Sequence, residues 1–491
     1  MIFDLAVIGA GMSGLAAAIR GAMSGKKVVL LERHTRIGGL NSYYFRQGQT
    51  IDVGLHALTN FYQPRQSTSP LFRVLRQLRI SYEELQLLPH RSSVVSFPDQ
   101  ELVFSNQREQ LLTEIAQKFP AEIDNFMRLI EWAKEYPLSA LSGGEYKSAR
   151  AFLPSIIKDR LLQEMLLFPI MFYGSSWEDD IDLEQFAILF KSIFLEGLSR
   201  PKGGVRVILQ ILQQRLYEEG CELRLGREVV EVVDVKDVSL LLKVRVGAQT
   251  EEVFARKVIS CAGYLETDAL FSKEKVKGMS DEVNIAGKIS FTEAIWCCRR
   301  TPAWQHAVVF FSKNNQSYYR RPPGLIDTNS GLICFPDNFG EKNEGSERTV
   351  RLSLLANFDL WHQLAQSSQS SQTMEYQEAK QQCEAMSVAL LRDYFLRQRL
   401  DQGPYQGLNQ GIDSVLGEVI FRDFYTPWSI HRYTGRVGGA VYGCQKKFRD
   451  GRTTHPNLYL CGTDHGLLGV VGALLSGITV ANQYIVAESA L

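Results

Sequence analysis

The sequence lacks an excess of charge of either sign. Lysine plus arginine and aspartate plus glutamate number 54 each among 491 residues. A nucleic-acid-binding chain usually carries a basic excess, because the phosphate backbone is the dominant partner. We therefore expect no nucleic acid among its partners.

Paired cysteines are missing as well. The eight cysteines are scattered, and none forms a Cys-x-x-Cys pair or a spaced Cys/His set, so we predict no metal site. Several cysteines lie in apolar runs, where the side chain behaves as a small hydrophobe. This usage is typical of a reducing compartment, and we expect a cytoplasmic protein.

We also expect no removable leader and no membrane-spanning helix. Phe3 already belongs to the first predicted strand, which leaves no room for a leader before it. Residues 466–487 carry no charge, but the run contains several glycines, Asn482 and Gln483 and follows directly on a strand. These features favour a helix buried in a large protein over a membrane span.

A second apolar segment, residues 183–198, predicts a helix that is rich in phenylalanine and leucine. Two interpretations stay open. The helix can be an ordinary part of the core. Alternatively, it can line a lipophilic channel or form a monotopic patch that gives peripheral contact with a membrane.

The strongest pattern that is present lies in the first forty residues. Residues 3–8 form an apolar, β-branched run typical of a buried parallel strand, residues 15–20 predict a helix, and residues 26–31 predict a second strand that ends at Glu32. The turn between the first strand and the helix reads Gly9-Ala-Gly-Met-Ser-Gly14. A G-x-G-x-x-G turn in this context, with an acid about twenty residues further on, predicts a dinucleotide site.

Each residue of this motif has a physical task. Gly9 permits a tight turn, Gly11 lets backbone N–H groups approach a pyrophosphate, and Gly14 lets the helix pack closely on the strand. The helix N-terminus offers donors and a positive dipole end to the phosphates. Glu32 can accept the ribose hydroxyls and repels a 2′-phosphate, so we do not expect NADP.

Further motifs resemble one family of FAD enzymes. The doublet Gly38-Gly39, with Leu40 after it and Asp52-Val-Gly54 further on, is not needed by an NAD domain and resembles the motif of FAD oxidoreductases of the amine-oxidase and phytoene-desaturase superfamily. Pro201-Lys-Gly-Gly204, the helix after it and the strand near Val229 resemble the segment that returns the chain to the FAD domain in that family.

The C-terminal part extends this resemblance. Residues 425–443 contain Thr-Pro, Arg-Tyr-Thr-Gly and Tyr-Gly in the order found in carotenoid isomerases and retinol saturases. Residues 457–464 are a strand that ends in Asp464, and Gly469-Val-Val-Gly-Ala473 opens the last helix. In the family, this aspartate binds the ribityl chain and the helix N-terminus points at the flavin.

The resemblance implies FAD as the cofactor and an α/β fold, with a Rossmann-like FAD-binding domain of the GR2 type and an α+β substrate domain built from inserted segments. We expect residues 1–90, 200–270 and 425–491 to form the FAD-binding domain, and residues 91–199 and 271–424 to form the substrate-binding domain. The expected cofactor-binding residues are Gly9, Gly11, Met12, Ser13, Gly14, Glu32, Arg33, Gly38, Gly39, Leu40, Val229, Gly462, Asp464, Gly472 and Ala473.

The implied function is that of an FAD-dependent oxidoreductase. It would act as a desaturase, saturase or redox-neutral isomerase on C–C or C=C bonds of a hydrophobic, polyene-like small molecule such as a carotenoid or retinoid. A flavin amine oxidase that makes peroxide and a non-catalytic FAD-binding protein remain the alternatives. His56 and His431 are candidate catalytic residues because a neutral imidazole near a flavin can exchange a proton, and a structural hydrogen bond is the alternative for each.

Overall fold

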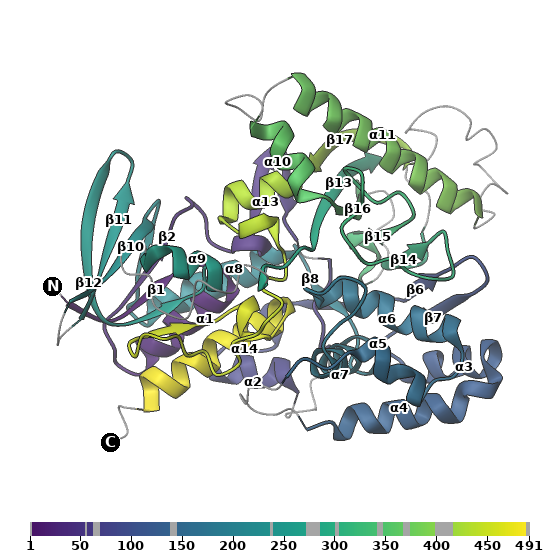
Figure 1. The fold of residues 1–491 in the computed structure, drawn as a ribbon, viewed down its shortest axis with the longest axis horizontal. Helices are drawn as coiled ribbons and strands as arrows, with labels where there is room; N and C mark the ends of the chain where they lie inside the picture. Colours follow the sequence, from purple (N-terminus) through teal and green to yellow (C-terminus); the bar gives the residue numbers. More distant parts are fainter. Residues whose placement is uncertain are drawn as a thin grey trace.

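Two seven-stranded sheets organise the part of the chain that the structure describes (Figure 1). This computed structural model describes residues 2–54, 56–61, 69–137, 145–235, 239–271, 285–299, 304–340, 347–366, 374–397 and 416–487. Both sheets combine strands that lie far apart in the sequence.

The first sheet has the strand order β10-β11-β12-β1-β2-β9, and β18 lies beside β12. Its strands are β1 (Ile2–Ile8), β2 (Val28–Glu32), β9 (Glu222–Leu225), β10 (Glu228–Val235), β11 (Ser239–Val246), β12 (Gln249–Ser260) and β18 (Leu458–Leu460). The five strands β9, β2, β1, β12 and β18 pair in parallel, so their carboxyl ends meet at one edge. In an α/β sheet, ligands bind at this edge.

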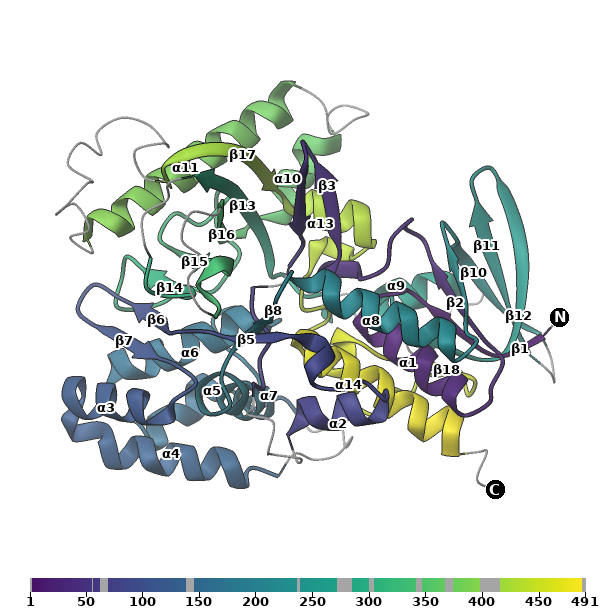
Figure 2. The same cartoon turned by 180° about the vertical axis from the view of Figure 1, so that it is seen from behind.

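Three helices pack together around the glycine turn: α1 (Met12–Met23), α8 (Val205–Glu218) and α14 (Gly469–Ala481). The contact between α1 and α14 depends on Gly477, where an added Cβ would overlap the carbonyl oxygen of Ser13. The two helices run side by side, and the first turn of α1 lies against the middle of α14, where Ser13 meets Gly477 (Figure 2).

The apolar run near the C-terminus forms α14 and one further π-helical turn. Residues Gly469–Val486 are long and apolar enough to cross a membrane, but half of this stretch is buried inside the protein. At its far end, the Arg20 guanidinium donates two hydrogen bonds to Asn482 Oδ1, of 3.0 and 2.8 Å. Packing against α1 therefore accounts for much of its apolar character.

The second sheet has the order β17-β13-β16-β15-β14-β6-β7. Its strands are β6 (Ser93–Ser96), β7 (Glu101–Phe104), β13 (Ser290–Arg299), β14 (Val308–Ser312), β15 (Ser330–Cys334), β16 (Arg348–Ala356) and β17 (Glu418–Tyr425). Neighbouring residues of a strand face opposite sides, as Val94 and Val95 show by joining different clusters of buried side chains. Both faces of this sheet are therefore covered.

Helices supply both covers (Figures 1 and 2). One face packs on α3 (Arg108–Lys118), α4 (Ile123–Glu135), α5 (Ala149–Phe152), α6 (Arg160–Gly174) and α7 (Leu183–Phe190), and the other on α10 (Phe358–Gln366) and α11 (Met374–Arg397). The remaining named elements are β3 (Tyr43–Arg46), β4 (Gln49–Asp52), α2 (Pro70–Gln77), β5 (Leu87–Pro89), β8 (Ser199–Pro201), α9 (Tyr264–Asp268) and α13 (Pro427–Thr434).

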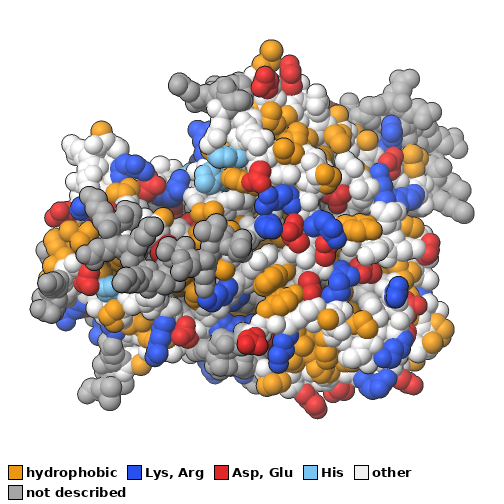
Figure 3. Space-filling view, in the orientation of Figure 1, with side chains coloured by type: hydrophobic (Ala, Val, Ile, Leu, Met, Phe, Trp, Pro, Cys, Tyr) orange, Lys and Arg blue, Asp and Glu red, His pale blue; other side chains and the backbone are white. Residues whose placement is uncertain are grey.

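The phenylalanine-rich segment at 183–198 belongs to the core. The α-helix α7 ends at Phe190, and a π-helical turn, Lys191–Leu195, follows it. Phe186, Phe190 and Phe194 are fully buried, and the ring of Phe190 contacts the other two. These rings are therefore not available as a membrane patch. On the face drawn in Figure 3, hydrophobic side chains are interspersed with charged ones.

The α/β architecture confirms the expected fold class. The strands of the first sheet fall within residues 1–90, 200–270 and 425–491, and those of the second fall within 91–199 and 271–424 except for the last residue of β17. The assignment of these two groups to separate domains stays a prediction.

Candidate functional site

A cavity of about 1170 Å³ lies where the carboxyl edge of the first sheet meets the second sheet. Pockets for a single small molecule usually measure about 300–1000 Å³, so this one has room for more than one ligand. Its walls come from the glycine turn and the 38–40 loop, the β3–β4 hairpin, β13, β16, α13 and the start of α14.

The glycine turn forms one end of the floor. Gly9 has a φ of +93°, which side chains rarely adopt. An added Cβ at Gly11 would point into open space, with no atom within 4 Å, whereas one at Gly14 would overlap the carbonyl oxygen of Gly9. Gly11 therefore keeps the cavity open, and Gly14 keeps the helix close to the strand.

Two helix N-termini face this floor. Met12 and Ser13 of α1 and Gly469, Val470 and Ala473 of α14 line the cavity. Within the described part of the chain, no side chain caps either helix. Free N–H groups and two positive dipole ends form a site for anionic groups such as phosphates.

Glu32 lies at the end of the cavity that is farthest from the second sheet. Its Oε2 accepts a 2.7 Å hydrogen bond from the backbone N–H of Ala10, and its Oε1 accepts a 2.8 Å bond from that of His34. Arg33 and Val229 line the same end. An ionised carboxylate has about four acceptor positions, so two remain for the hydroxyls of a ribose.

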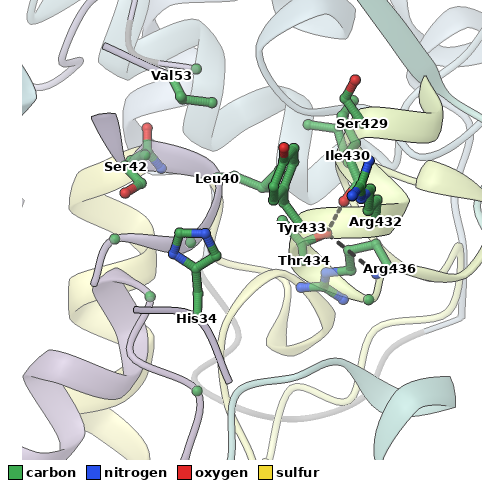
Figure 4. A pocket seen from close by; sticks show the side chains of 18 of the residues that line it. His34, Leu40, Ser42, Val53, Ser429, Ile430, Arg432, Tyr433, Thr434 and Arg436 are labelled. Atoms are coloured by element: carbon green, nitrogen blue, oxygen red, sulfur yellow. Dashed lines mark hydrogen bonds between the residues drawn. The ribbon is translucent and has the colours of Figure 1, made fainter. Parts of the chain in front are cut away.

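The second glycine doublet lies directly on the first motif. The N–H of Gly38 donates to the carbonyl of Ala10 at 2.8 Å, and Gly38, Gly39 and Leu40 all line the cavity. Gly54 fits against this loop, because an added Cβ there would overlap the carbonyl oxygen of Leu40. Figure 4 shows Leu40 facing Tyr433 of α13 across the pocket.

Asp464 is among the predicted binding residues, but its carboxylate is held inside the protein. It is 1% exposed and accepts 2.7 Å hydrogen bonds from the N–H groups of Tyr264 and Cys444. Burial alone would raise the pKa of Asp464, but Arg436, which is 3.5 Å away, and Lys447 hold it below the ordinary value. Arg436, unlike Asp464, lines the cavity.

Gly14 and Gly472, like Asp464, do not line the cavity, whereas the other predicted cofactor-binding residues do. An added Cβ at Gly472 would come within 2.9 Å of the backbone of Leu467. Both glycines permit close backbone packing on the side of the floor that faces away from the cavity. Direct contact of these three residues with a cofactor stays a prediction.

The structure separates the two candidate histidines. His431 lies outside the cavity wall, with Nδ1 2.8 Å from the carbonyl oxygen of Arg436 and its ring stacked on Trp428. This arrangement supports the structural alternative for His431. His56 lines the cavity, and its Nε2 lies 3.1 Å from Ser353 Oγ and 3.6 Å from Glu293 Oε1.

A buried ion pair lies behind His56. Arg351 donates to both oxygens of Glu293, at 2.8 Å from Nε and 2.7 Å from Nη2. Burial raises the pKa of Glu293, but Arg351 and His56 outweigh it and leave that pKa below its ordinary value. Burial also lowers the pKa of His56 to about 4, so the ring is neutral at pH 7.

The rest of this inner end is mostly aromatic. Phe172, Tyr173, Phe291, Leu332 and Tyr442 line it, and the Phe172 and Phe291 rings lie 5.6 Å apart. We did not predict these residues or Glu293, Arg351 and Ser353 as site residues, because they belong to no local motif. The only feature of the sequence that could have indicated them is the alternation of residues along strands whose ends meet at one sheet edge.

The outer end of the cavity is aromatic and charged. Tyr44 donates a 2.8 Å hydrogen bond to Asp423, and Arg46 forms a 2.8 Å ion pair with the same carboxylate. The rings of Tyr44 and Tyr425 meet edge to face at 5.5 Å. The charge of Asp423 is therefore already balanced.

Comparisons with known proteins agree with this geometry. The family described as "Flavin containing amine oxidoreductase" matches residues 12–276, more than half of the chain. A chloroplastic prolycopene isomerase of Daucus carota is 24% identical over 298 residues, covering 54% of this chain and 47% of that protein. An all-trans-retinol 13,14-reductase of Danio rerio is 31% identical over 301 residues, covering 54% and 48%.

The chain thus spans about half the length of these two curated relatives. Among solved structures, an oxidoreductase from Methanosarcina mazei superposes with a TM-score of 0.61 at 16% identity, covering 97% of this chain and 99% of the other. At this identity the likeness concerns the fold alone.

Proposed function

The chain belongs to the flavin-containing amine oxidoreductase family, and from this premise we propose that it is an FAD-dependent oxidoreductase that acts on C–C or C=C bonds of a lipophilic, polyene-like substrate. The observation that carries the substrate class is the inner end of the cavity. Its wall is aromatic and aliphatic, and the charge of Glu293, which lines it, is paired with Arg351 behind the wall. Such a wall favours an uncharged, elongated hydrocarbon.

FAD is the cofactor, and the residues present fit it. The open space at Gly11 and the uncapped N-terminus of α1 would hold the pyrophosphate, and Glu32 would hold the adenosine ribose. The doublet Gly38-Gly39 gives the backbone close access to the ring end. Bound flavin supplies a two-electron acceptor or donor for hydride.

The chain's own residues have three tasks in this proposal. The aromatic walls orient the substrate and exclude water from the inner end. The N-terminus of α14 stabilises negative charge at the ring end of the cofactor site. His56 is the titratable side chain of the inner end that stays neutral at pH 7 and can take or give a proton.

The alternative function is amine oxidation, and the edge-to-face pair Tyr44–Tyr425 is the observation that favours it. Aromatic rings can hold a cationic amine. However, the acidic side chains that line the cavity apart from Glu32 all lie within 4 Å of an arginine nitrogen; they are Glu228, Glu266, Glu293 and Asp423. An ammonium group would find no free carboxylate there, so we rank this function second.

Anaerobic incubation of the FAD-loaded protein with a panel of cis, partly saturated and fully conjugated polyenes tests the proposal. The flavin is oxidised in one series and reduced with dithionite in the other, and products are separated by chromatography. We expect at least one polyene to change its double-bond geometry or number. Peroxide formation from a mono- or diamine, with every polyene unchanged, would instead establish the alternative.

A further inference from the structure

Lys380 of α11 brings a positive charge into the wall of the outer end of the cavity. Together with Tyr376 and Gln377, it forms the part of the wall that this helix contributes. The three positions lie on one side of the first two turns of the helix, because residues three and four apart share a face. Lys380 is only partly buried, so it keeps surface that a ligand can reach.

The beginning of α11 is fixed against the second sheet. The hydroxyl of Tyr376 lies 2.6 Å from Thr426 Oγ1, directly after β17, and its ring meets that of Trp361 edge to face at 5.6 Å. Ala379 and Phe424 belong to the same cluster of buried side chains, and α11 lies beside β17 (Figures 1 and 2). The backbone that carries Lys380 is therefore held in place at the cavity.

The carboxylates nearest to Lys380 are already paired with other cations. Asp423 accepts a 2.8 Å hydrogen bond from Arg46, and Glu384, one turn further along α11, lies 4.0 Å from Arg422. Among the residues that the structure describes, neither a hydrogen bond nor an ion pair joins Lys380 to either carboxylate. Three cations and two carboxylates thus meet at the outer end, and one positive charge is left over.

The ammonium group of Lys380 lies in a place where a negative partner would stabilise it. Burial is the largest influence on its pKa and lowers it, because the charged form loses water. Arg46 lowers the pKa further, whereas Asp423 and Glu384 raise it. A bound anion would replace part of the lost hydration with a charge-assisted hydrogen bond.

The two ends of the cavity therefore differ in what they favour. At the inner end, the charge of Glu293 is paired with Arg351, and the rings of Phe172 and Phe291 form part of the wall. At the outer end, Lys380 has no counter-charge of its own. A molecule with a hydrocarbon chain and one negative end group matches both ends, whereas an amine would bring a second positive charge to Lys380.

We propose that Lys380 binds the terminal carboxylate of an amphiphilic, polyene-like substrate, and that it is a specificity-determining residue of this cavity. This inference rests on the proposed function and narrows its substrate class. A carboxylate carries one negative charge and accepts hydrogen bonds from a lysine ammonium group. A phosphate monoester would bring about 1.5 to 2 negative charges to a single unpaired cation, so a carboxylate fits better.

An anchored end group has a consequence for selectivity. When the carboxylate is held at Lys380, the length of the chain beyond it determines how far the hydrocarbon reaches into the inner end. The same C–C bond is then presented at the ring end of the cofactor site in each turnover. Lys380 would in this way select the position of the bond as well as the kind of molecule.

The conjugated tetraene cis-parinaric acid and its methyl ester test this assignment on the FAD-loaded protein. Both fluoresce more strongly in an apolar site, so a titration below the concentration at which they form micelles gives both dissociation constants. We expect the wild type to bind the acid at least about tenfold more tightly than the ester at pH 7, as for a hydrogen bond to a charged group. In Lys380→Met, the affinity for the acid should fall about tenfold, while that for the ester stays within about twofold.

Lys380→Arg and Lys191→Met are the controls, and each variant is first checked for one FAD per chain. Lys380→Arg keeps the positive charge and should still prefer the acid. Lys191 is also partly buried and has its pKa lowered by burial, but it lies outside the cavity, so Lys191→Met should bind both ligands as the wild type does.

Equal affinity of the wild type for the acid and the ester would refute the assignment, as would an equal loss of both ligands in Lys380→Met. A wild type that prefers the acid but transforms no polyene would refute the proposed function while leaving the role of Lys380 in binding intact. A wild type that transforms a polyene without preferring the acid would have the opposite meaning.

Discussion

Gly11 and Gly14 stand three residues apart in one motif, and the structure gives them opposite physical constraints. Gly11 has an ordinary φ of −70° and open space where a Cβ would lie. Gly14 has no such space, because a Cβ would overlap the carbonyl oxygen of Gly9. Only the first of them leaves room for a ligand.

Gly11→Val should therefore lose the cofactor and keep the fold. The side chain would project into the cavity without backbone strain, so we expect the unfolding free energy of the FAD-free protein to change by less than about 0.5 kcal/mol. FAD affinity should fall by at least about tenfold, equivalent to about 1.4 kcal/mol. Urea unfolding and titration with FAD measure the two quantities.

Gly14→Ala is the matched control. Its Cβ has to displace α1 from β1, so we expect a stability loss of about 1–3 kcal/mol, as for overpacked cores. Equal loss of stability in both variants would show that Gly11 is structural, and an unchanged FAD affinity in Gly11→Val would show that no phosphate lies over it.

Three histidines, of which His90 and His465 are buried and His56 is partly buried, make the fold sensitive to acid. Burial lowers the pKa of His56, His90 and His465 to about 4. An unfolded histidine titrates near pH 6.5. Between pH 6.5 and 4 the unfolded chain therefore binds protons that the folded chain does not, and stability falls as the pH is lowered.

Urea unfolding of the FAD-free protein should show this loss. Each histidine should contribute roughly 2 kcal/mol between pH 7 and pH 5. His90→Gln should lose correspondingly less than the wild type over the same range. A stability that does not change from pH 7 to pH 5 would contradict the buried, neutral state of these rings.

At the residue scale, the sequence predicted the features that local patterns determine, and it did not predict the features that contacts between distant residues determine. Gly9, Gly11 and Glu32 have positions set by the few residues around them, so the motif alone locates them at the cavity. Glu293 and Arg351 lie more than 230 residues from His56, and only the pairing of β13 with β16 brings them together. No pattern in the sequence records that pairing.

At the scale of elements, the same distinction holds. The first strand–helix–strand unit was predicted within a few residues, because its periodicity and its turn agree. The second sheet could not be assembled from sequence, since β6 pairs in parallel with β14, which lies more than 200 residues later. The helix predicted at 183–198 ends as an α-helix at Phe190, and a π-helical turn follows it. The two forms differ in their backbone hydrogen bonds, and the apolar pattern of the side chains does not distinguish them.

The contact between α1 and α14 is the element-scale feature on which the cavity floor depends. In Gly477→Ala, the new methyl group would overlap the Ser13 carbonyl and force the helices apart. We expect a loss of about 1–3 kcal/mol in stability, together with weaker FAD binding, because both helices contribute N–H groups to the floor.

Gly324→Ala provides the control, since an added Cβ there meets no atom within 4 Å. Thermal unfolding and FAD titration should leave it close to the wild type. If Gly477→Ala behaved like Gly324→Ala, the close packing of α1 on α14 would not support the site.

At the scale of the whole molecule, the two sheets are joined at one cavity. The first sheet carries two uncapped helix ends and Glu32, and the second supplies a largely aromatic wall and a buried polar cluster. A cofactor and a lipophilic substrate held there would lie in direct contact, which is the central claim of this account.

Flavin fluorescence during titration with a long polyene tests that claim most directly. The account predicts saturable quenching at one polyene per bound FAD, with no effect of a diamine at the same concentration. A polyene that binds without changing the flavin signal, or a flavin signal that responds to the diamine alone, would contradict it.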